Sequence, residues 1–330
     1  MEWPKEWKNS CVSSLIDRYV CGGVALREGR LVPHGSFFSC VIDESNQSSL
    51  VVDLKRQAEG FRDSVKLFHR NGLSKNSIIS AHKIMYRDAD YHGFRSLQNF
   101  VGQKSKKVIV HIPPPADKIL ELFNDWLKSF HNGKDEDLNQ IIVQYVRFLS
   151  IHPFRDGNGR TARAILEYLL EKSGFAVPNL ELYRFRFDEE NYSRNFSVNL
   201  DNDISEKGYW KDSIKWAKLV NEEINERLEN TKKIIEKKII LRSLDTYDSE
   251  VLKKIFKYPV LNIKFAAKIL NVNDDISRQC LERLESIGVF ERVASSYNNG
   301  FMYVSSDVFH FLFAVDGIIF KRENVTKKNL

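Results

Sequence analysis

The sequence predicts a mainly α-helical protein with one small β-hairpin in its first half and a second hairpin near its end. Three observations support this prediction. Apolar residues recur at helical spacing over residues 116–131 and 138–150. A β-branched run at positions 107–112 is stopped by three prolines, which favours a short edge strand. Residues 249–304 follow the order helix, turn, helix, hairpin.

Two apolar helices are expected on either side of one polar loop. The first covers residues 138–150, and its inward positions are Ile141, Ile142, Tyr145, Val146, Phe148 and Leu149. The second is marked by the apolar residues Ile165, Leu166, Leu169 and Leu170, with Gly174 where a C-cap belongs and Pro178 beyond it. The glycines of the loop fall at the start of this second helix, so its first backbone N–H groups are open to an anion.

The loop and the helix start read HPFRDGNGRTAR at positions 152–163. His152 is the only group in it whose ordinary pKa suits proton abstraction near neutrality. A single carboxylate, Asp156, together with phosphate oxygens and water, is a usual way to hold Mg²⁺. Phe154 is most simply a core anchor.

The second half of the same motif carries groups that bind phosphate. Gly157 and Gly159 allow a tight turn and a close approach of the backbone to an anion. Asn158 either tolerates a left-handed conformation or donates its amide to an oxygen. Arg160 and Arg163 are three residues apart on one helical face, and guanidinium groups match phosphate oxygens in pairs. Each feature alone is common in turns, but their joint occurrence within twelve residues favours an enzyme that acts on a nucleotide.

This stretch resembles the signature of the Fic family, HxFx(D/E)GNGRxxR, at every specified position. The resemblance implies a Fic-type helical core with a small β-hairpin flap, and transfer of AMP from ATP to a protein hydroxyl. His152 would then deprotonate the attacking Ser, Thr or Tyr hydroxyl, and Asp156 would hold the Mg²⁺ that bridges the α- and β-phosphates. The other implied roles are the anion hole (Gly157, Asn158, Gly159), the β-phosphate contact (Arg160), the γ-phosphate contact (Arg163) and the loop anchor (Phe154).

Two further segments resemble parts of that family. Residues 93–102 resemble the stretch before the flap, and the flap itself would pair with the backbone of the target through Val108, Ile109, Val110 and His111. Taken from composition alone, a plain surface hairpin explains these residues equally well. Residues 188–192 resemble an acidic-then-tyrosine segment near the adenine, so Tyr192 is carried over as a nucleotide contact. A half-buried tyrosine on an ordinary helix is the alternative for it.

Many Fic proteins carry an inhibitory helix of the form (S/T)xxxE(G/N), whose Glu pairs with the second arginine of the signature. The nearest match here runs from Ser39 to Asp43 and Glu44, with Asp43 in place of Glu and Glu44 in place of Gly or Asn. Residues 13–18 and 55–60 are weaker matches. Because Asp is one methylene shorter than Glu, whether an inhibitory segment operates stays open.

The last third resembles the winged helix-turn-helix domain that often follows Fic cores. Its second helix would enter the major groove of DNA in a DNA reader, and four residues would face outward: Asn273, Ser277, Arg278 and Arg283. Acids outnumber bases in the same segment, through Asp274, Asp275, Glu282 and Glu285. Phosphate contacts need a basic surface, so protein docking is favoured over DNA binding.

Composition sets broad limits on the class of protein. The chain has 330 residues, 42% hydrophobic content and a net charge of +6, which does not itself imply a nucleic-acid partner. Neither a run of about 18 apolar residues nor a signal h-region is present, and four cysteines lack CxxC spacing. We therefore expect a cytoplasmic protein without a membrane partner. The expected regions are an N-terminal region (1–64), a Fic core (65–205), a helical connector (206–244) and a winged helix (245–330).

The leading functional prediction is a protein adenylyltransferase that uses Mg-ATP and releases pyrophosphate. Self-modification by AMP transfer belongs to this prediction. One alternative is a transcription regulator whose winged helix binds DNA while the Fic core senses a nucleotide. Another is an enzyme that removes AMP from a modified protein, which depends on a well-placed inhibitory Glu. The sequence specifies neither the target nor the oligomeric state, and a homodimer is compatible with it.

Overall fold

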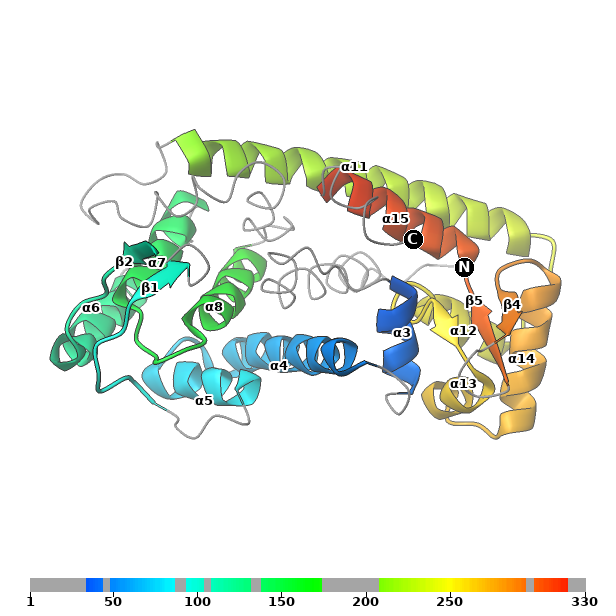
Figure 1. The fold of residues 1–330 in the computed structure, drawn as a ribbon. Coiled ribbons are helices and arrows are strands. Elements are labelled where there is room, and N and C mark those ends of the chain that lie inside the picture. The colour runs from blue at the N-terminus through cyan, green and yellow to red at the C-terminus, as the bar shows by residue number, and fades with distance from the viewer. Residues whose placement is uncertain are drawn as a thin grey trace. The chain divides into compact units, whose positions relative to one another are not determined.

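The computed structural model describes residues 34–43, 48–86, 93–103, 108–131, 138–173, 208–294 and 300–319. These residues are mainly helical, with two small antiparallel sheets, so the predicted mainly α class is confirmed (Figure 1). The chain divides into two compact units. One unit is Gln57–Leu219, and the other joins Met1–Arg56 to Val220–Leu330. Among the described residues, no helix is long and apolar enough to cross a membrane.

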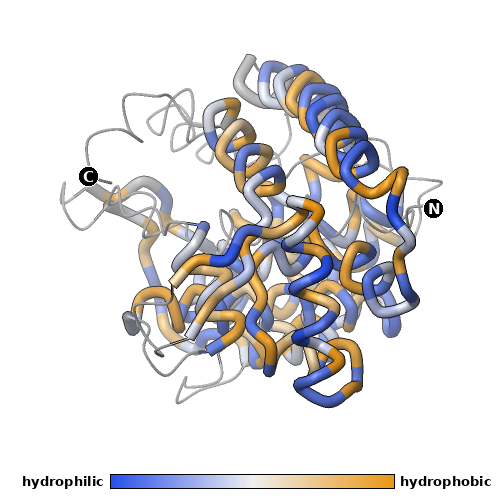
Figure 2. The backbone as a smooth tube through the Cα atoms, turned by 90° about the vertical axis from the view of Figure 1, so that its right-hand side faces the viewer, coloured by the Kyte–Doolittle hydropathy of each residue, from blue (hydrophilic) through white to orange (hydrophobic). Residues whose placement is uncertain are grey.

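The unit Gln57–Leu219 is built mainly from helices that carry one buried and one polar face. Across the described helices of the chain, Figure 2 shows hydrophobic and hydrophilic residues in alternation, a pattern typical of amphipathic helices. The helices of this unit are most of α4 (Ser49–Asn71), α5 (Lys75–Met85), α6 (Ile119–His131), α7 (Leu138–Ile151) and α8 (Asn158–Lys172), with a short 3₁₀ turn, η1 (Ala116–Lys118), ahead of α6. The helices predicted over residues 116–131 and 138–150 are thus confirmed, the first with a 3₁₀ opening turn.

An aromatic cluster forms the core beneath the polar loop between α7 and α8. Phe123 contacts Trp126 and Phe94, with ring centroids 5.3 and 4.6 Å apart, and Phe94 contacts Phe154 at 5.7 Å. Phe154 is fully buried. The predicted anchor of the loop is therefore tied to the core of this unit by ring packing, which fixes where the loop begins.

A two-stranded antiparallel sheet lies in the same unit. It pairs β1 (Val101–Gln103) with β2 (Val108–His111), and the register shifts between Val101 and Gly102. The strand predicted at residues 107–112 is therefore present. In sequence it is followed directly by the prolines that lead into η1 and α6.

The other unit contains a three-stranded antiparallel sheet in the order β3-β5-β4. Its elements are α12 (Thr246–Lys254), β3 (Val260–Leu261), α13 (Ile263–Leu270), α14 (Asp274–Ser286), β4 (Glu291–Ala294), β5 (Phe301–Val304) and α15 (Ser306–Ile319), and the long helix α11 (Gly208–Ile239) leads into them. Asn271 adopts a left-handed conformation that ends α13, and Asn273 caps α14 two residues later. The turn between the helices is short for this reason.

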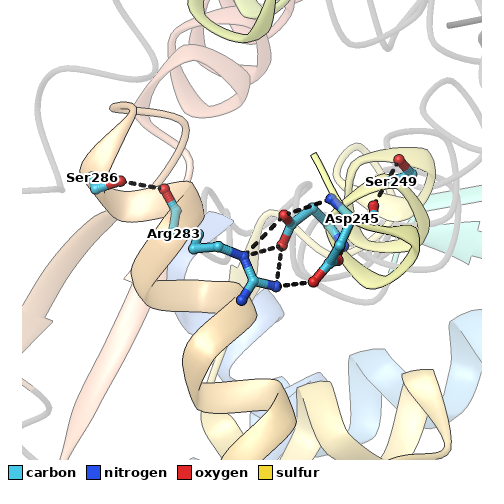
Figure 3. A network of polar contacts seen from close by, with 5 residues as sticks. Asp245, Ser249, Arg283 and Ser286 are labelled. Atoms are coloured by element: carbon cyan, nitrogen blue, oxygen red, sulfur yellow. Dashed lines mark hydrogen bonds and ion pairs between the residues drawn. The ribbon is translucent and has the colours of Figure 1, made fainter. Parts of the chain in front are cut away.

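An ion network with one fully buried member, shown in Figure 3, joins α14 to the start of α12. The guanidinium of Arg283 donates to both carboxylate oxygens of Asp248, at 3.0 to 3.3 Å, and also to Asp245. The Asp248 side chain is completely buried. Ser277 is buried as well, and its hydroxyl donates to the carbonyl of Ile263. The expectation that Ser277 faces outward is therefore wrong, whereas Arg283 stays partly exposed while its guanidinium holds α14 to α12.

Helix α3 (His34–Ile42) packs within this same unit. The ring of His34 hydrogen-bonds through Nε2 to Asp316 of α15 at 2.9 Å, with both residues buried. Phe38 of α3 lies edge-on to Phe309 of α15, with centroids 6.2 Å apart. The described residues of α3 thus share a core with the C-terminal elements.

Candidate active site

The loop that carries the sequence motif begins where α7 ends. His152 follows Ile151 with a φ of +50°, a left-handed conformation that few non-glycine residues adopt. Its N–H still donates to Phe148 O at 3.1 Å. Its ring Nδ1 lies 3.2 Å from Leu149 O. A carbonyl only accepts, so Nδ1 carries the proton and the neutral ring keeps the lone pair on Nε2.

The protonation state of His152 follows from its surroundings. Burial lowers the pKa of the imidazole to about 4, and the hydrogen bond to Leu149 O acts in the opposite direction. Smaller charge effects come from His111 and Arg95, which lower the pKa, and from Asp156, which raises it. His152 is therefore neutral at pH 7 and available to accept a proton.

Donors from outside the loop hold its backbone carbonyls and one carbonyl in the last turn of α7. They come from α5, from the segment before β1 and from β2. The pairs are His111 Nε2 with Ser150 O (2.9 Å), Arg95 Nε with His152 O (2.9 Å), Arg95 N with Pro153 O (2.8 Å), Asn99 Nδ2 with Phe154 O (3.2 Å) and His82 Nε2 with Asp156 O (3.0 Å). The loop is therefore fixed from its carbonyl side.

The start of α8 has no such cap on its N–H side. Gly157 is the N-cap residue, with φ +81°, and no side chain caps the first turn. A left-handed N-cap strongly favours glycine, and a Cβ there would also overlap the ring of Tyr86. The side chain of Asn158 is buried and bonds to both the N–H and the carbonyl of Phe154, each at 2.8 Å. Asn158 therefore closes the loop with its side chain, and only its backbone N–H remains for an anion.

A column of planar groups leads from the core to the predicted phosphate ligand. Phe154 stacks on His82 with centroids 4.0 Å apart, and His82 stacks on Tyr86 at 5.0 Å. The guanidinium of Arg160 lies 4.5 Å from the centroid of the Tyr86 ring. This geometry suits a cation–π contact, which holds the charge of Arg160 near the helix start.

The second arginine of the motif is brought to the same place. Arg163 is buried on α8, with 8% of its surface exposed. Its Nη1 would lie 3.4 Å from a Cβ added at Gly159. The absence of a side chain at Gly159 therefore leaves room for the guanidinium beside the first turn of α8.

Asp156 fits the role of a carboxylate ligand to a divalent cation. Its side chain is exposed, and its Oδ1 accepts the N–H of Gly157 at 2.6 Å. No group of three or more metal-binding side chains occurs within the part of the chain that the structure describes. A cation here would rely on substrate oxygens and water for its other ligands, as Mg²⁺ commonly does.

The remaining predicted residues lie elsewhere or outside the described residues. Val108, Ile109, Val110 and His111 form β2, where Ile109 is exposed. Ser39 lies in α3 and Asp43 follows its last residue. Glu44 and Tyr192 are outside the described residues.

Sequence reasoning missed three residues of the site: His82, Tyr86 and Arg95. His82 and Tyr86 are four residues apart, on one face at the end of α5, which is the only signal that the sequence offered for them. Arg95 lies within the stretch that resembles the family, but nothing in its spacing indicated its acceptors.

Comparison with known proteins agrees with this geometry. Residues 72–170 match the model of the Fic/DOC family, so the chain contains a Fic domain. The chain is 35% identical over 85 residues to "Protein adenylyltransferase Fic" of Drosophila willistoni, and 37% identical over 106 residues to the protein of that name from Nematostella vectensis. These alignments cover 25% and 30% of this chain, but only 16% and 22% of the relatives.

One solved structure supports the fold over most of the chain. It is a Fic family protein from Desulfovibrio desulfuricans G20, at a TM-score of 0.53 and 16% identity, with 92% of this chain and 88% of that chain covered. At this level of identity the likeness concerns the fold alone. The helical core with a small sheet is thus a Fic fold.

Proposed function

We propose that the chain is a protein adenylyltransferase that transfers AMP from ATP to a Ser, Thr or Tyr hydroxyl of a protein. One observation supports the proposal most directly. A neutral His152, with the lone pair on Nε2, follows α7, and the next helix, α8, starts without a side-chain cap and bears Arg160 and Arg163. One short loop thus combines a base with a helix N-terminus that binds anions. This combination suits the attack of a hydroxyl on a phosphorus atom. The names of the similar proteins agree with this chemistry.

The residues of the loop divide the work between binding and proton transfer. The backbone N–H groups at the start of α8, from Asn158 and Gly159, would bind phosphate oxygens. Arg160 would leave the Tyr86 ring for the β-phosphate, and Arg163 would bind the γ-phosphate. Asp156 would hold Mg²⁺, which neutralises charge on the phosphate chain when bound.

The transfer step balances without any further reagent. The target hydroxyl oxygen forms a bond to the α-phosphorus while the bond from that phosphorus to the α–β bridging oxygen breaks. Pyrophosphate carries away the electron pair, and Nε2 of His152 takes the hydroxyl proton. The rate acceleration comes from positioning and charge neutralisation, because the protein forms no covalent bond with the substrate.

The target would bind along the sheet β1–β2. We infer that its backbone adds to this sheet as a strand, so that a hydroxyl near that strand reaches His152. The hairpin and its flanks expose large apolar side chains, which suit a protein partner: Leu97, Phe100, Ile109 and Ile112. ATP as the substrate, a chain that modifies itself and a homodimer also belong to this proposal, as does a cytoplasmic location.

The C-terminal elements would form a winged helix-turn-helix that binds protein. The order α12, β3, α13, α14, β4, β5 supports this fold. On its second helix, α14, the side chains of Ser277 and Arg283 bond to other parts of this chain. Asp274, Asp275 and Glu282 on the same helix are exposed. A surface of this charge disfavours phosphate contacts. A DNA-binding regulator remains the second candidate, and a gel shift on random DNA across a salt series tests it.

The inhibitory role of Ser39, Asp43 and Glu44 also remains a proposal, and removal of AMP would depend on it. Replacement of both Asp43 and Glu44 by Gly tests it. We expect raised self-labelling from the double variant if the segment acts as a brake. Unchanged labelling removes both the brake and the de-AMPylating alternative that rests on it.

The main proposal is tested with ATP labelled in its α-phosphate. We expect the full chain with Mg²⁺ to place labelled AMP on itself or on a protein in a lysate, and mass spectrometry then identifies the acceptor. His152→Ala should abolish labelling, while its circular dichroism and thermal unfolding match those of the wild type. Labelling of that variant at the wild-type rate contradicts the proposal.

A further inference from the structure

Arg95 contacts the loop and the hairpin at the same time. Its Nε donates to His152 O at 2.9 Å, and its backbone N–H donates to Pro153 O at 2.8 Å. Its other two nitrogens donate to Leu97 O at 3.1 Å and to Pro114 O at 2.5 Å. One side chain therefore has three carbonyl acceptors in three separate segments.

Two of these acceptors form the base of the hairpin. Leu97 precedes β1 and Pro114 follows β2, so the guanidinium joins the two flanks of the sheet. A second bond in the same place runs from Gln98 Nε2 to Pro113 O at 2.9 Å. The third acceptor, His152 O, belongs to the loop. The position of the hairpin base and that of the His152 backbone are therefore set by the same planar group.

The chemistry of Arg95 is not that of a residue that merely fills space in the core. Only 5% of its surface is exposed, and its acceptors among the described residues are backbone carbonyls. Burial without a carboxylate is costly for a cation and lowers the pKa of Arg95. An apolar side chain would fill the space at lower cost. The rigid fork of a guanidinium reaches three separate carbonyls, which a lysine ammonium on a flexible stem cannot do.

The segment that Arg95 holds is the one that needs support. His152 has a left-handed backbone, which persists only where neighbouring groups fix it. The fork of Arg95 lies on the carbonyl of this residue. A second link, His111 Nε2 to Ser150 O at 2.9 Å, joins β2 to the last turn of α7. Two side chains, Arg95 and His111, thus link the hairpin to the loop and to the end of α7.

We propose that Arg95 is a positioning residue that couples the target-binding hairpin to His152. This inference rests on the proposed function and deepens it. When a target strand adds to β1–β2, the hairpin base is held at Leu97 and Pro114. Arg95 transmits that constraint to the carbonyl of His152. The imidazole is then fixed at the distance that proton transfer requires.

The kinetic test compares Arg95→Lys with Arg70→Lys. Arg70 is exposed near the end of α4, so the control makes the same chemical change away from the site. We expect Arg95→Lys to lower kcat of AMP transfer about 100-fold with KM for ATP within about twofold, because misplacement of a reacting group affects the chemical step. Arg70→Lys should match the wild type. An unchanged kcat, or a raised KM with kcat intact, overturns the proposal.

The second test needs no activity and separates this proposal from the proposed function. Hydrogen exchange of the full chain is followed in peptides that cover the hairpin and in peptides that cover residues 148–157. Arg95→Lys should speed exchange about tenfold in both segments, while Arg70→Lys changes neither. A rise in only one segment overturns the coupling, even if the wild type transfers AMP. If the wild type transfers nothing, the proposed function fails and this test still judges the coupling.

A third measurement uses the wild type alone, because Arg95→Lys has the additional risk of failing to fold. Exchange in the wild type is repeated over low concentrations of urea. Amides of the hairpin and of the loop should open as one cooperative unit, with one common dependence on urea. Two separate openings would overturn the coupling without any substitution.

Discussion

The start of α8 is built differently from the helix starts of the C-terminal unit, and also from that of α5 in its own unit, which the side chain of Ser74 caps. α12, α13 and α14 each begin behind a side chain that accepts a backbone N–H of the first turn, and these residues are Asp245, Asn262 and Asn273. α8 begins behind Gly157, and no side chain caps its first turn. A capped start is satisfied by its own chain, whereas the start of α8 keeps the positive end of its dipole for an anion.

Arginines in the two units differ in the same sense. Arg283 is bound to the carboxylates of Asp245 and Asp248, so its charge is neutralised within the protein. Arg160 lies on the ring of Tyr86, which holds a cation without neutralising it. The comparison of these two arginines shows one cation bound by carboxylates of the chain and one held by an aromatic ring, which leaves the second charge available to a ligand.

Gly157→Ala should have the largest effect on activity. Alanine at φ +81° is strained, and its Cβ would overlap the Tyr86 ring, so the ring or the helix start must move. We expect AMP transfer to fall about 1000-fold, as when backbone donors to a developing charge are displaced. A radiolabel assay measures it. The counterpart Asn273→Ala in the C-terminal unit should cost about 1 kcal/mol of stability and leave transfer unchanged.

If Gly157→Ala transfers AMP normally, the contrast between the two helix starts has no functional meaning. If Asn273→Ala is as damaging to transfer as Gly157→Ala, the C-terminal unit contributes to the site in a way that the caps do not explain.

Arg283→Ala should be the most destabilising arginine substitution in the C-terminal unit. It leaves the carboxylate of Asp248 buried without its cation, which costs about 3 kcal/mol. Urea unfolding measures the loss. Arg278→Ala on the exposed side of the same helix is the matched control, with a change below about 0.5 kcal/mol. Equal effects of the two substitutions would show that the ion network around Asp248 is not what holds α14.

The stability of the loop should depend on pH through His152. Its folded-state pKa of about 4 lies below the unfolded value, so the unfolded chain takes up a proton first as the pH falls. Stability is therefore complete above the unfolded pKa of about 6.5 and is lost as the pH falls towards 4. The loss is about 2 kcal/mol after allowance for partial exposure of the ring.

The check is urea unfolding at pH 7 and pH 4.5. His152→Gln should lose less stability over this interval than the wild type, because glutamine does not titrate. His310→Gln, on the exposed side of α15, is the control that should follow the wild type. The pKa assignment is wrong if His152→Gln and the wild type have the same pH dependence.

The sequence predicted the loop, its two helices and its anchor, because these follow from local spacing. Apolar residues at helical intervals indicated α7 and α8, and Phe154 is buried as expected. The side chains that hold the loop from other elements were not predictable in this way. Arg95 and His82 bond to backbone carbonyls 57 and 74 residues away, and a carbonyl is present at every residue.

The partners of Arg283 were missed for a similar reason. Periodicity placed Arg283 on a polar face of α14, but its partner Asp248 is 35 residues upstream, on another helix. Asn158 shows the converse case. Its place in the motif indicated contact with a phosphate, whereas its side chain is used to close the loop on Phe154. Spacing along a chain predicts the face of a helix, but it does not predict which distant group meets that face.

Tyr86→Leu should give the smallest of these effects and sharpen the comparison between the arginines. Loss of the ring removes a cation–π contact of about 1 kcal/mol from Arg160, which the wild type gives up when ATP binds. We therefore expect KM for ATP to fall about fivefold, with a small change in kcat. Tyr86→Phe keeps the ring and should resemble the wild type. If Phe and Leu act alike, the ring does not hold Arg160.

The most direct test of the central claim is a crystal structure of the His152→Ala variant with Mg-ATP. The account predicts the triphosphate at the start of α8, with phosphate oxygens within hydrogen-bond distance of the N–H groups of Asn158 and Gly159, and with Arg160 moved from Tyr86 onto a phosphate. A triphosphate bound elsewhere on the chain, with Arg160 still on the ring, would contradict it.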